Sequence, residues 1–457
     1  MKAVVCGAGR VGYGIARELA REGNAVTVVD WSAELIDRIT TDLDVRGVVG
    51  HGSHPDVLKR AGAKEADLLV AVTYSDETNM IACQVAHSLF NTPTRIARVR
   101  AQSYLDRQWR DLFSTDNLPV DVTISPELEV SRSILQRLET PGAFTTAPFA
   151  NGRVQILGVR VDETSPVAGS SRDQILDLFP DLALDIVGIL RDKTLFVPEG
   201  HDPLMPEDEV YLSVAAGHVG RALDVFGRAV QRARRVVLVG AGNIGLYVAQ
   251  ALERVSGVKV RLIEGDKARA EHAADTLRRT VVLHGDGLDR QVLREAGVED
   301  AELAICLTND DKVNLLSSVM AKREGAQRTL ALVNDEAFRP VKAALDIDVM
   351  IDPRTVTIST ILQHIRRGRI TGLQTLGGGE AEALEGVVLS TSPLVGKQLD
   401  EMELPEDVAV CALVRGEKVH FRRDSVTIEE NDRVVFFALK SAVSKVEQLF
   451  RVSLEYF

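Results

Sequence analysis

The residues of this chain with the clearest chemical potential are two glycine-rich hexapeptides. They read Gly7-Ala8-Gly9-Arg10-Val11-Gly12 and, 233 residues further on, Gly240-Ala241-Gly242-Asn243-Ile244-Gly245. In a strand-turn-helix unit, the first glycine of this pattern allows a tight turn, the second lets backbone approach a pyrophosphate, and the third lets the helix pack on the strand. Unpaired N–H groups at the start of the helix then favour an anion. The pattern therefore predicts two phosphate-binding cradles.

An acidic residue follows each cradle at a matching distance. Asp30 ends the apolar segment 25–29, and Glu264 ends the segment 258–263. A carboxylate at this place can accept hydrogen bonds from ribose hydroxyls and would repel a 2′-phosphate, which favours NAD or an adenine nucleotide over NADP. The alternative is a glycine turn that packs a helix on a strand and binds nothing. Two copies with matched acids favour ligand binding.

The segments around the cradles predict the elements that position them. Apolar residues 3–6 and 236–239 predict strands that lead into the glycines, and Val11, Ile15 and Leu19 recur with the spacing of one helix face. Further along, both copies continue with strand-like and helix-like runs in alternation. This alternation predicts a parallel, doubly wound α/β sheet in each copy.

The ends of later strands add candidate ligand contacts. Ligands of such sheets lie beyond the carboxyl ends of the strands. That rule places Thr73 and Tyr74 beside the first cradle, and Thr308 and Asn309 beside the second.

Two differences predict that the sites are not equivalent. Arg98 could reach the phosphates of the first site or could be a surface strand charge, and Val333 stands at its place in the second copy. His51 stands where the second copy has Asp286. A metal pair of His51 with His54 would need a third ligand, and none lies near in sequence, so a polar loop is the better interpretation.

A smaller module follows each nucleotide half. The modules share Ser-Pro-x-x-Gly, at residues 165–169 and 392–396, and a β-rich pattern that predicts an α+β unit. Residues 127–139 and 355–365 have a helical pattern, and the runs 140–151 and 377–379 that follow them are predicted to be flexible. The predicted domains are residues 1–125 (Rossmann-like), 140–226 (small), 233–353 (Rossmann-like) and 370–457 (small).

Composition limits the function classes. A net charge of −12 and a pI near 5.4 argue against nucleic-acid binding, which needs a basic face. The chain starts without a signal-peptide pattern and has no apolar run of membrane-spanning length, so we expect a cytoplasmic protein. The four cysteines, which show no CxxC pair, are expected to be buried apolar residues, without a metal or disulfide role.

Four features of this chain together resemble the RCK or KTN domain family, over essentially the whole chain. They are the doubled fingerprint, the two acids, the Ser-Pro-x-x-Gly motifs and the order of four segments. The resemblance implies a regulatory subunit, in a tetrameric ring, that binds NAD(H) or ATP and ADP and controls a membrane potassium transporter from its cytoplasmic face. It also implies site residues, and the small modules would be RCK C-terminal modules. The first site would comprise Gly7, Ala8, Gly9, Arg10, Val11, Gly12, Asp30, Thr73, Tyr74 and Arg98. The second would comprise Gly240, Ala241, Gly242, Asn243, Ile244, Gly245, Glu264, Asp286, Thr308 and Asn309. His51 departs from the family's commoner Gly-Asp pattern, which leaves the ligand of the first site open.

Two other functions compete with a regulator that lacks catalytic residues. An NAD-dependent oxidoreductase would use the same cradle but needs a proton-transfer residue at the nicotinamide. In this chain no Tyr is followed by Lys four positions on, which removes one such class, and each small module is short for a substrate domain. A scaffold that nucleotide merely stabilises is the other alternative.

Overall fold

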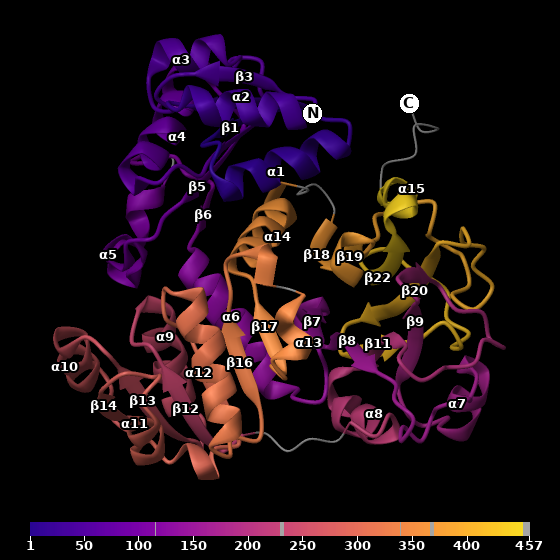
Figure 1. Ribbon diagram of the computed structural model, residues 1–457. Coiled ribbons are helices and arrows are strands. Elements are labelled where there is room, and N and C mark those ends of the chain that lie inside the picture. Colours follow the sequence, from indigo (N-terminus) through magenta and orange to yellow (C-terminus); the bar gives the residue numbers. More distant parts are fainter. Residues whose placement is uncertain (115, 229–232, 339, 366–369, 451–457) are drawn as a thin grey trace. The chain divides into compact units, whose positions relative to one another are not determined.

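Each half of the repeat forms a parallel six-stranded sheet in the computed structural model (Figure 1), which describes residues 1–457 except 115, 229–232, 339, 366–369 and 451–457. The strands of the first sheet, in spatial order, are β3 (Arg46–Val49), β2 (Ala25–Asp30), β1 (Lys2–Cys6), β4 (Leu68–Ala71), β5 (Thr94–Arg98) and β6 (Val122–Ile124). Those of the second are β14 (Val281–His284), β13 (Lys259–Glu264), β12 (Arg235–Val239), β15 (Leu303–Cys306), β16 (Thr329–Leu332) and β17 (Val349–Ile351). The order 3-2-1-4-5-6 is that of the Rossmann fold, which confirms the predicted doubly wound sheets.

Helices connect the strands of both sheets. The first half contains α1 (Arg10–Arg21), α2 (Ala33–Asp42), α3 (Pro55–Arg60), α4 (Asp76–Phe90), α5 (Gln102–Leu105), η1 (Arg107–Phe113) and α6 (Pro126–Glu139). The second contains α9 (Asn243–Glu253), α10 (Lys267–Thr276), α11 (Arg290–Glu295), η4 (Val298–Asp300), α12 (Asp311–Arg323), η5 (Glu336–Phe338), α13 (Val341–Ala344) and α14 (Pro353–Ile365). The two segments predicted as connecting helices, 127–139 and 355–365, lie in α6 and α14.

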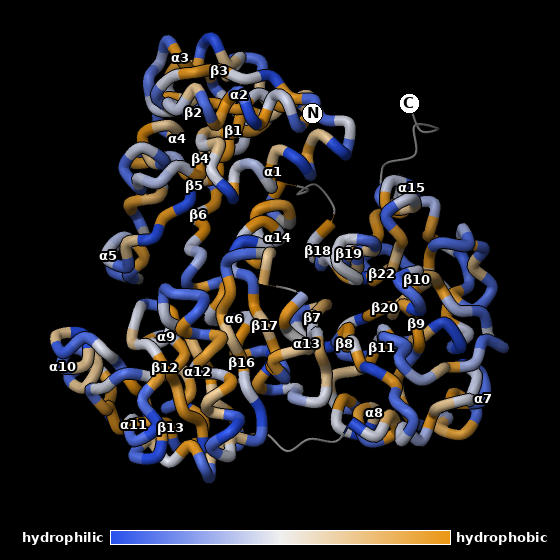
Figure 2. Tube along the Cα trace, viewed as in Figure 1, coloured by the Kyte–Doolittle hydropathy of each residue, from blue (hydrophilic) through white to orange (hydrophobic). Residues whose placement is uncertain are grey.

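Apolar residues follow one another along the central strands without alternation. Both faces of each Rossmann sheet are therefore apolar and buried. Val5 of β1 packs in one core cluster with Ile15 and Leu19 of α1, while Val4 and Cys6 pack in the cluster on the other face. Figure 2 shows the same apolar colouring along the central strands of the second sheet. All four cysteines are free and buried, as predicted.

Helix α14 belongs to the second half in sequence but completes the core of the first. Ile361 and Leu362 are buried in the cluster that contains Ile15 of α1. The contact is close, since a methyl group on Gly14 of α1 would lie 2.3 Å from Cδ1 of Ile358. The helical pattern of this segment was predicted, but its packing partner was not.

The two small modules are five-stranded antiparallel sheets with the same topology. The first has the order β10 (Thr194–Phe196), β9 (Leu184–Arg191), β11 (Glu209–Ala215), β8 (Val154–Arg160) and β7 (Thr145–Phe149), with α7 (Arg172–Leu178) and α8 (Val219–Val225). The second has β21 (Lys418–His420), β20 (Val408–Arg415), β22 (Arg433–Leu439), β19 (Ala381–Val387) and β18 (Ile370–Leu376), with α15 (Val443–Leu449). Short 3-10 turns complete the modules: η2 (Ala150–Gly152), η3 (Ala216–His218), η6 (Gly377–Gly379) and η7 (Lys440–Ala442).

One prediction for these modules was wrong. The run 140–151 was expected to be flexible, but its residues 145–149 form β7, which pairs with β8. The run 377–379 forms the turn η6. Pro148 is compatible with β7 because this strand lies at an edge of the sheet, where one side of the strand has no neighbouring strand to receive N–H groups.

The chain forms two compact units, each built from both halves of the repeat. One comprises Met1–Leu135 and Ala233–Ile365, and the other comprises Gln136–Arg232 and Arg366–Phe457. In the second unit, Phe149 and Tyr211 of the first module share a core cluster with Phe437 of the second. The limits predicted for four successive domains remain a prediction.

Candidate functional site

The first cradle has the backbone geometry that a phosphate site requires. Gly7 follows β1 with a φ of +111°, and a methyl group on Gly12 would lie 1.8 Å from the carbonyl oxygen of Gly7. Gly9 is the N-cap of α1, and a methyl group added there would meet no heavy atom within 4 Å, so this position opens away from the protein. The N-terminus of α1, which begins at the exposed Arg10, is therefore free to receive an anion.

The second cradle repeats this geometry closely. Gly240 has a φ of +106°, and a methyl group on Gly245 would lie 2.0 Å from the carbonyl oxygen of Gly240. Gly242 is the N-cap of α9 and, like Gly9, has no heavy atom within 4 Å of an added Cβ. The first helical residue, Asn243, is exposed where the first cradle has Arg10. The intervening positions agree as well: Ala8 and Ala241 are buried, and Val11 and Ile244 are half-buried.

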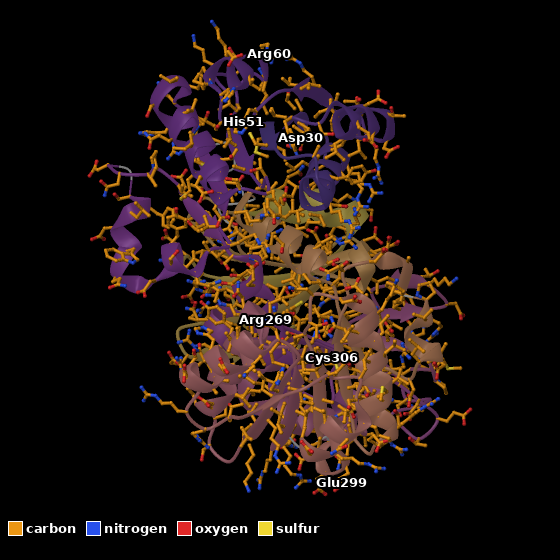
Figure 3. The ribbon with its side chains drawn as sticks, turned by 60° about the vertical axis from the view of Figure 1, so that its left-hand side comes forward. Asp30, His51, Arg60, Arg269, Glu299 and Cys306 are labelled. Carbon is orange, nitrogen blue, oxygen red and sulfur yellow. The ribbon has the colours of Figure 1, made fainter. Side chains whose placement is uncertain are left out.

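The two acids close the cradles through backbone hydrogen bonds. Asp30 accepts hydrogen bonds from the N–H groups of Ala8 (2.7 Å) and Ser32 (2.8 Å). Glu264 accepts the equivalent pair from Ala241 (2.7 Å) and Asp266 (2.8 Å). Figure 3 labels Asp30 in the first half and Arg269, the neighbour of Glu264, in the second. Each acid lies at the end of the second strand, where ribose hydroxyls of a bound nucleotide are expected.

Glu264 differs from Asp30 by an ion pair with Arg269. The guanidinium Nη2 lies 2.7 Å from Oε1 of Glu264, and Nε lies 3.2 Å from the same oxygen. Burial raises the pKa of Glu264, but the hydrogen bonds from Arg269 and from the two backbone N–H groups outweigh burial and hold the pKa below the ordinary value of 4.5. The carboxylate is therefore ionised at neutral pH.

Thr73 and Thr308 lie beside the cradles as predicted, but their hydroxyls are engaged by a buried asparagine. Oδ1 of Asn79 accepts hydrogen bonds from the N–H (2.8 Å) and the hydroxyl (2.7 Å) of Thr73. Oδ1 of Asn314 accepts the same pair from Thr308, each at 2.7 Å. The next residues, Tyr74 and Asn309, are exposed at the edge of the site.

Sequence reasoning missed the residues that hold this edge of the sheet. Nδ2 of Asn79 donates to the carbonyl oxygen of Arg98 (2.9 Å), so this side chain ties the end of β4 to the end of β5. Asp76, at the start of α4, accepts hydrogen bonds from the N–H groups of Arg100 (2.9 Å) and Ala101 (2.8 Å). Asp311 and Asn314 occupy the same places in the second half. The available signal was a pair of Asp-x-x-Asn sequences 235 residues apart.

Arg98 lies at the edge of the first site, but its side chain is turned to the protein. Nη2 donates to the carbonyl oxygen of Thr73 at 2.7 Å, and the buried Nε has no hydrogen-bond partner. Burial, with the adjacent Arg100, lowers the pKa of Arg98. The prediction that Val333 stands at this place in the second half was wrong. Asn314 donates to the carbonyl oxygen of Leu332 as Asn79 does to that of Arg98, so the buried Leu332 is the equivalent residue and Val333 corresponds to Val99. A contact between Arg98 and phosphate remains a prediction.

The loops after β3 and β14 carry the other difference between the sites. His51 is exposed, its Nδ1 lies 3.0 Å from Oγ of Ser53, and its ring stacks on His54 with a centroid distance of 4.6 Å. Asp286 is exposed and accepts a hydrogen bond from the N–H of Leu288 at 2.9 Å. Both loops lie at the carboxyl edge of their sheet, next to the acid-bearing strand.

Comparison with known proteins assigns the family. The TrkA-N domain model matches residues 3–126 and 236–353, and the TrkA-C domain model matches residues 384–451. The Trk system potassium uptake protein TrkA of Azorhizobium caulinodans is 49% identical over 458 residues, with 100% of both chains covered. The chain belongs to the TrkA family. Another TrkA family protein, from Halomonas elongata, is 40% identical, again with 100% of both chains covered.

Solved structures agree with this TrkA family fold. The RCK domain of GsuK superposes with a TM-score of 0.59 at 18% identity, covering 98% of this chain and 94% of that one. The GsuK channel bound to NAD superposes with a TM-score of 0.59 at 18% identity and covers 98% of this chain and 78% of the other. Among the residues that the structure describes, no helix is long and apolar enough to cross a membrane.

Proposed function

We propose that this chain is a nucleotide-binding regulatory subunit of a potassium uptake transporter, without a catalytic step of its own. It couples the binding of NAD(H), or of ATP and ADP, to potassium transport. The observation that carries the proposal is the pair of open cradles, in which Gly9 and Gly242 leave the starts of α1 and α9 accessible to an anion. The names of the two relatives, and of the GsuK channel bound to NAD, support it.

The packing of the cradle helices supports a coupling between nucleotide binding and shape. Helix α1 begins at the first cradle and packs on α14 through Gly14 and Ile358. Helix α9 begins at the second cradle, and the hydroxyl of Tyr247 on it donates to Oε1 of Gln102 in the first half at 2.6 Å. A ligand that shifts either helix would therefore displace a contact between the halves. A nucleotide regulates only through different affinities for two such arrangements.

The proposed partner is a membrane potassium transporter subunit similar to TrkH or TrkG. The chain would dock on it from the cytoplasmic face, as a peripheral protein and as a homo-oligomer. A ring of four chains would contain eight Rossmann sheets, two from each chain. The acidic net charge of −12 favours docking on a protein over direct binding to anionic lipid.

Potassium uptake by vesicles that contain chain and transporter tests the proposal. Asp30→Ala and Glu264→Ala should each change the dependence of uptake on nucleotide, and by different amounts because the two sites differ. Glu299→Ala removes an exposed carboxylate that Figure 3 shows far from Arg269, and it should leave uptake unchanged. If neither site variant alters the response, the two-site regulator is wrong.

Two other results would favour the alternative functions. Steady oxidation of NADH with a small carbonyl compound would show an oxidoreductase. A nucleotide that binds but changes neither the radius of gyration nor transport would show a scaffold.

A further inference from the structure

The ribose-binding carboxylates of the two cradles are not equally free. Each oxygen of Asp30 accepts one hydrogen bond, from Ala8 or from Ser32. In Glu264, Oε2 accepts one hydrogen bond from Ala241, but Oε1 accepts three, one from the N–H of Asp266 and two from Arg269. Oε1 of Glu264 is therefore already occupied by hydrogen bonds before a nucleotide binds.

The number of lone pairs decides what this difference means. An ionised carboxylate offers about four acceptor positions, two on each oxygen. Asp30 retains one on each oxygen, which suits the two hydroxyls of a ribose. Glu264 retains one on Oε2 only, so a ribose that donates both hydroxyls must displace Arg269 from Oε1.

Arg269 is placed for this role by its helix and is able to move. It lies in the first turn of α10, whose N-cap Asp266 accepts a hydrogen bond from the N–H of Arg269 at 2.9 Å. Its side chain is 60% exposed, so release into solvent requires no change in the core. The corresponding residue of the first half is Leu35, whose N–H donates to the N-cap Ser32. The backbone is thus equivalent in the two halves, and only the side chain differs.

We propose that Arg269 sets the nucleotide affinity of the second site by competing with ribose hydroxyls for Glu264. The second site then binds any nucleotide with a free 2′,3′-diol more weakly than it would without this arginine. This inference rests on the proposed function, because it takes both cradles to be nucleotide sites. Arg269 acts here through Glu264, as a positioning residue.

Calorimetry of the full chain with ADP and with 2′,3′-dideoxyadenosine diphosphate tests the competition. The chain carries Gly9→Ala, which blocks the first cradle, with or without Arg269→Leu. ADP should bind roughly two- to five-fold more tightly after Arg269→Leu, the range set by an exposed ion pair. The dideoxy nucleotide lacks the competing hydroxyls, so its affinity should not change.

A matched control removes a similar arginine away from the cradle. Arg235 pairs with Glu302 at 3.0 Å, is 52% exposed and lies at the start of β12, at the opposite end of this strand from the cradle. Arg235→Leu changes the net charge equally and should leave both affinities unchanged. Unchanged or weaker ADP binding by Arg269→Leu, or an equal gain for both nucleotides, overturns the inference. If the unmodified chain binds neither ADP nor NADH, the proposed function itself is wrong.

Discussion

Alanine at the second and third glycines of a cradle should separate ligand binding from folding. Gly9 has φ −65° and ψ −178°, which alanine adopts without strain, and an added methyl group there meets no heavy atom within 4 Å. Gly9→Ala should therefore change the free energy of unfolding by less than about 1 kcal/mol. The methyl group would occupy the space where a pyrophosphate approaches, so nucleotide affinity at this cradle should fall at least about tenfold, or ~1.4 kcal/mol.

Gly12→Ala should instead destabilise the fold. Its methyl group would lie 1.8 Å from the carbonyl oxygen of Gly7, far inside the ordinary carbon contact of about 3.5 Å. Helix α1 must then move away from β1, and the cost is that of a severe overpacking, about 1–3 kcal/mol or more. Thermal unfolding and calorimetric titration with NADH on both variants measure the two effects separately.

If folded Gly9→Ala binds nucleotide as tightly as the unmodified chain, the cradle is not the ligand site. If Gly9→Ala and Gly12→Ala lose the same stability, the contacts inferred for the two glycines are wrong. The pair Gly242→Ala and Gly245→Ala repeats the test in the second cradle, where the corresponding clearance is 2.0 Å.

Three further predictions concern groups near the cradles. Asn314→Ala removes the hydrogen bonds that a fully buried amide makes to Thr308 and to the carbonyl oxygen of Leu332. Chemical denaturation should therefore show that the free energy of unfolding falls by about 2–4 kcal/mol. The control Asn309→Ala, at an exposed residue, should lower it by less than about 0.5 kcal/mol. Burial raises the pKa of Cys6 to about 12, and all four thiols are buried. A thiol reagent at pH 8 should therefore label the native chain negligibly and the unfolded chain fully. Rapid labelling of the native chain would contradict this expectation. The folded pKa of Glu264 lies below 4.5, so its stabilising contribution is complete above pH 4.5 and is lost as the pH falls through the folded pKa. The difference in unfolding free energy between the unmodified chain and Glu264→Gln should therefore shrink on that acidification. A difference that grows would contradict the lowered pKa.

The sequence predicted the Rossmann sheets because their determinants are local. The glycines, the acid at the end of the second strand and the apolar runs each fix a turn or an element within a few residues. The order 3-2-1-4-5-6 then follows from the fold class. The segment 145–149 was misassigned because Thr-Thr-Ala-Pro-Phe carries a proline, and whether a proline is tolerated depends on the strand lying at an edge, which a local pattern does not reveal.

The features that sequence reasoning missed depend on residues far apart in the chain. The helical period of α14 shows an apolar face, but nothing in that period identifies α1 as the surface that covers Ile361. Asn79 resembled any polar helix residue until β5 was placed beside β4, where its amide reaches the carbonyl oxygen of Arg98. Arg269 is the exception, because it lies only five residues beyond Glu264. It was missed because the residue pattern does not show that its side chain turns back from the first turn of α10 to that carboxylate.

The central claim is that one chain holds two unequal nucleotide sites. Equilibrium dialysis of the full chain against labelled ADP and NADH, with and without Asp30→Ala or Glu264→Ala, tests this claim most directly. We predict two nucleotides per chain at saturation, with the loss of one site in each variant and the tighter site lost with Asp30→Ala. Binding of no nucleotide, or the loss of both sites in either variant, would contradict the account.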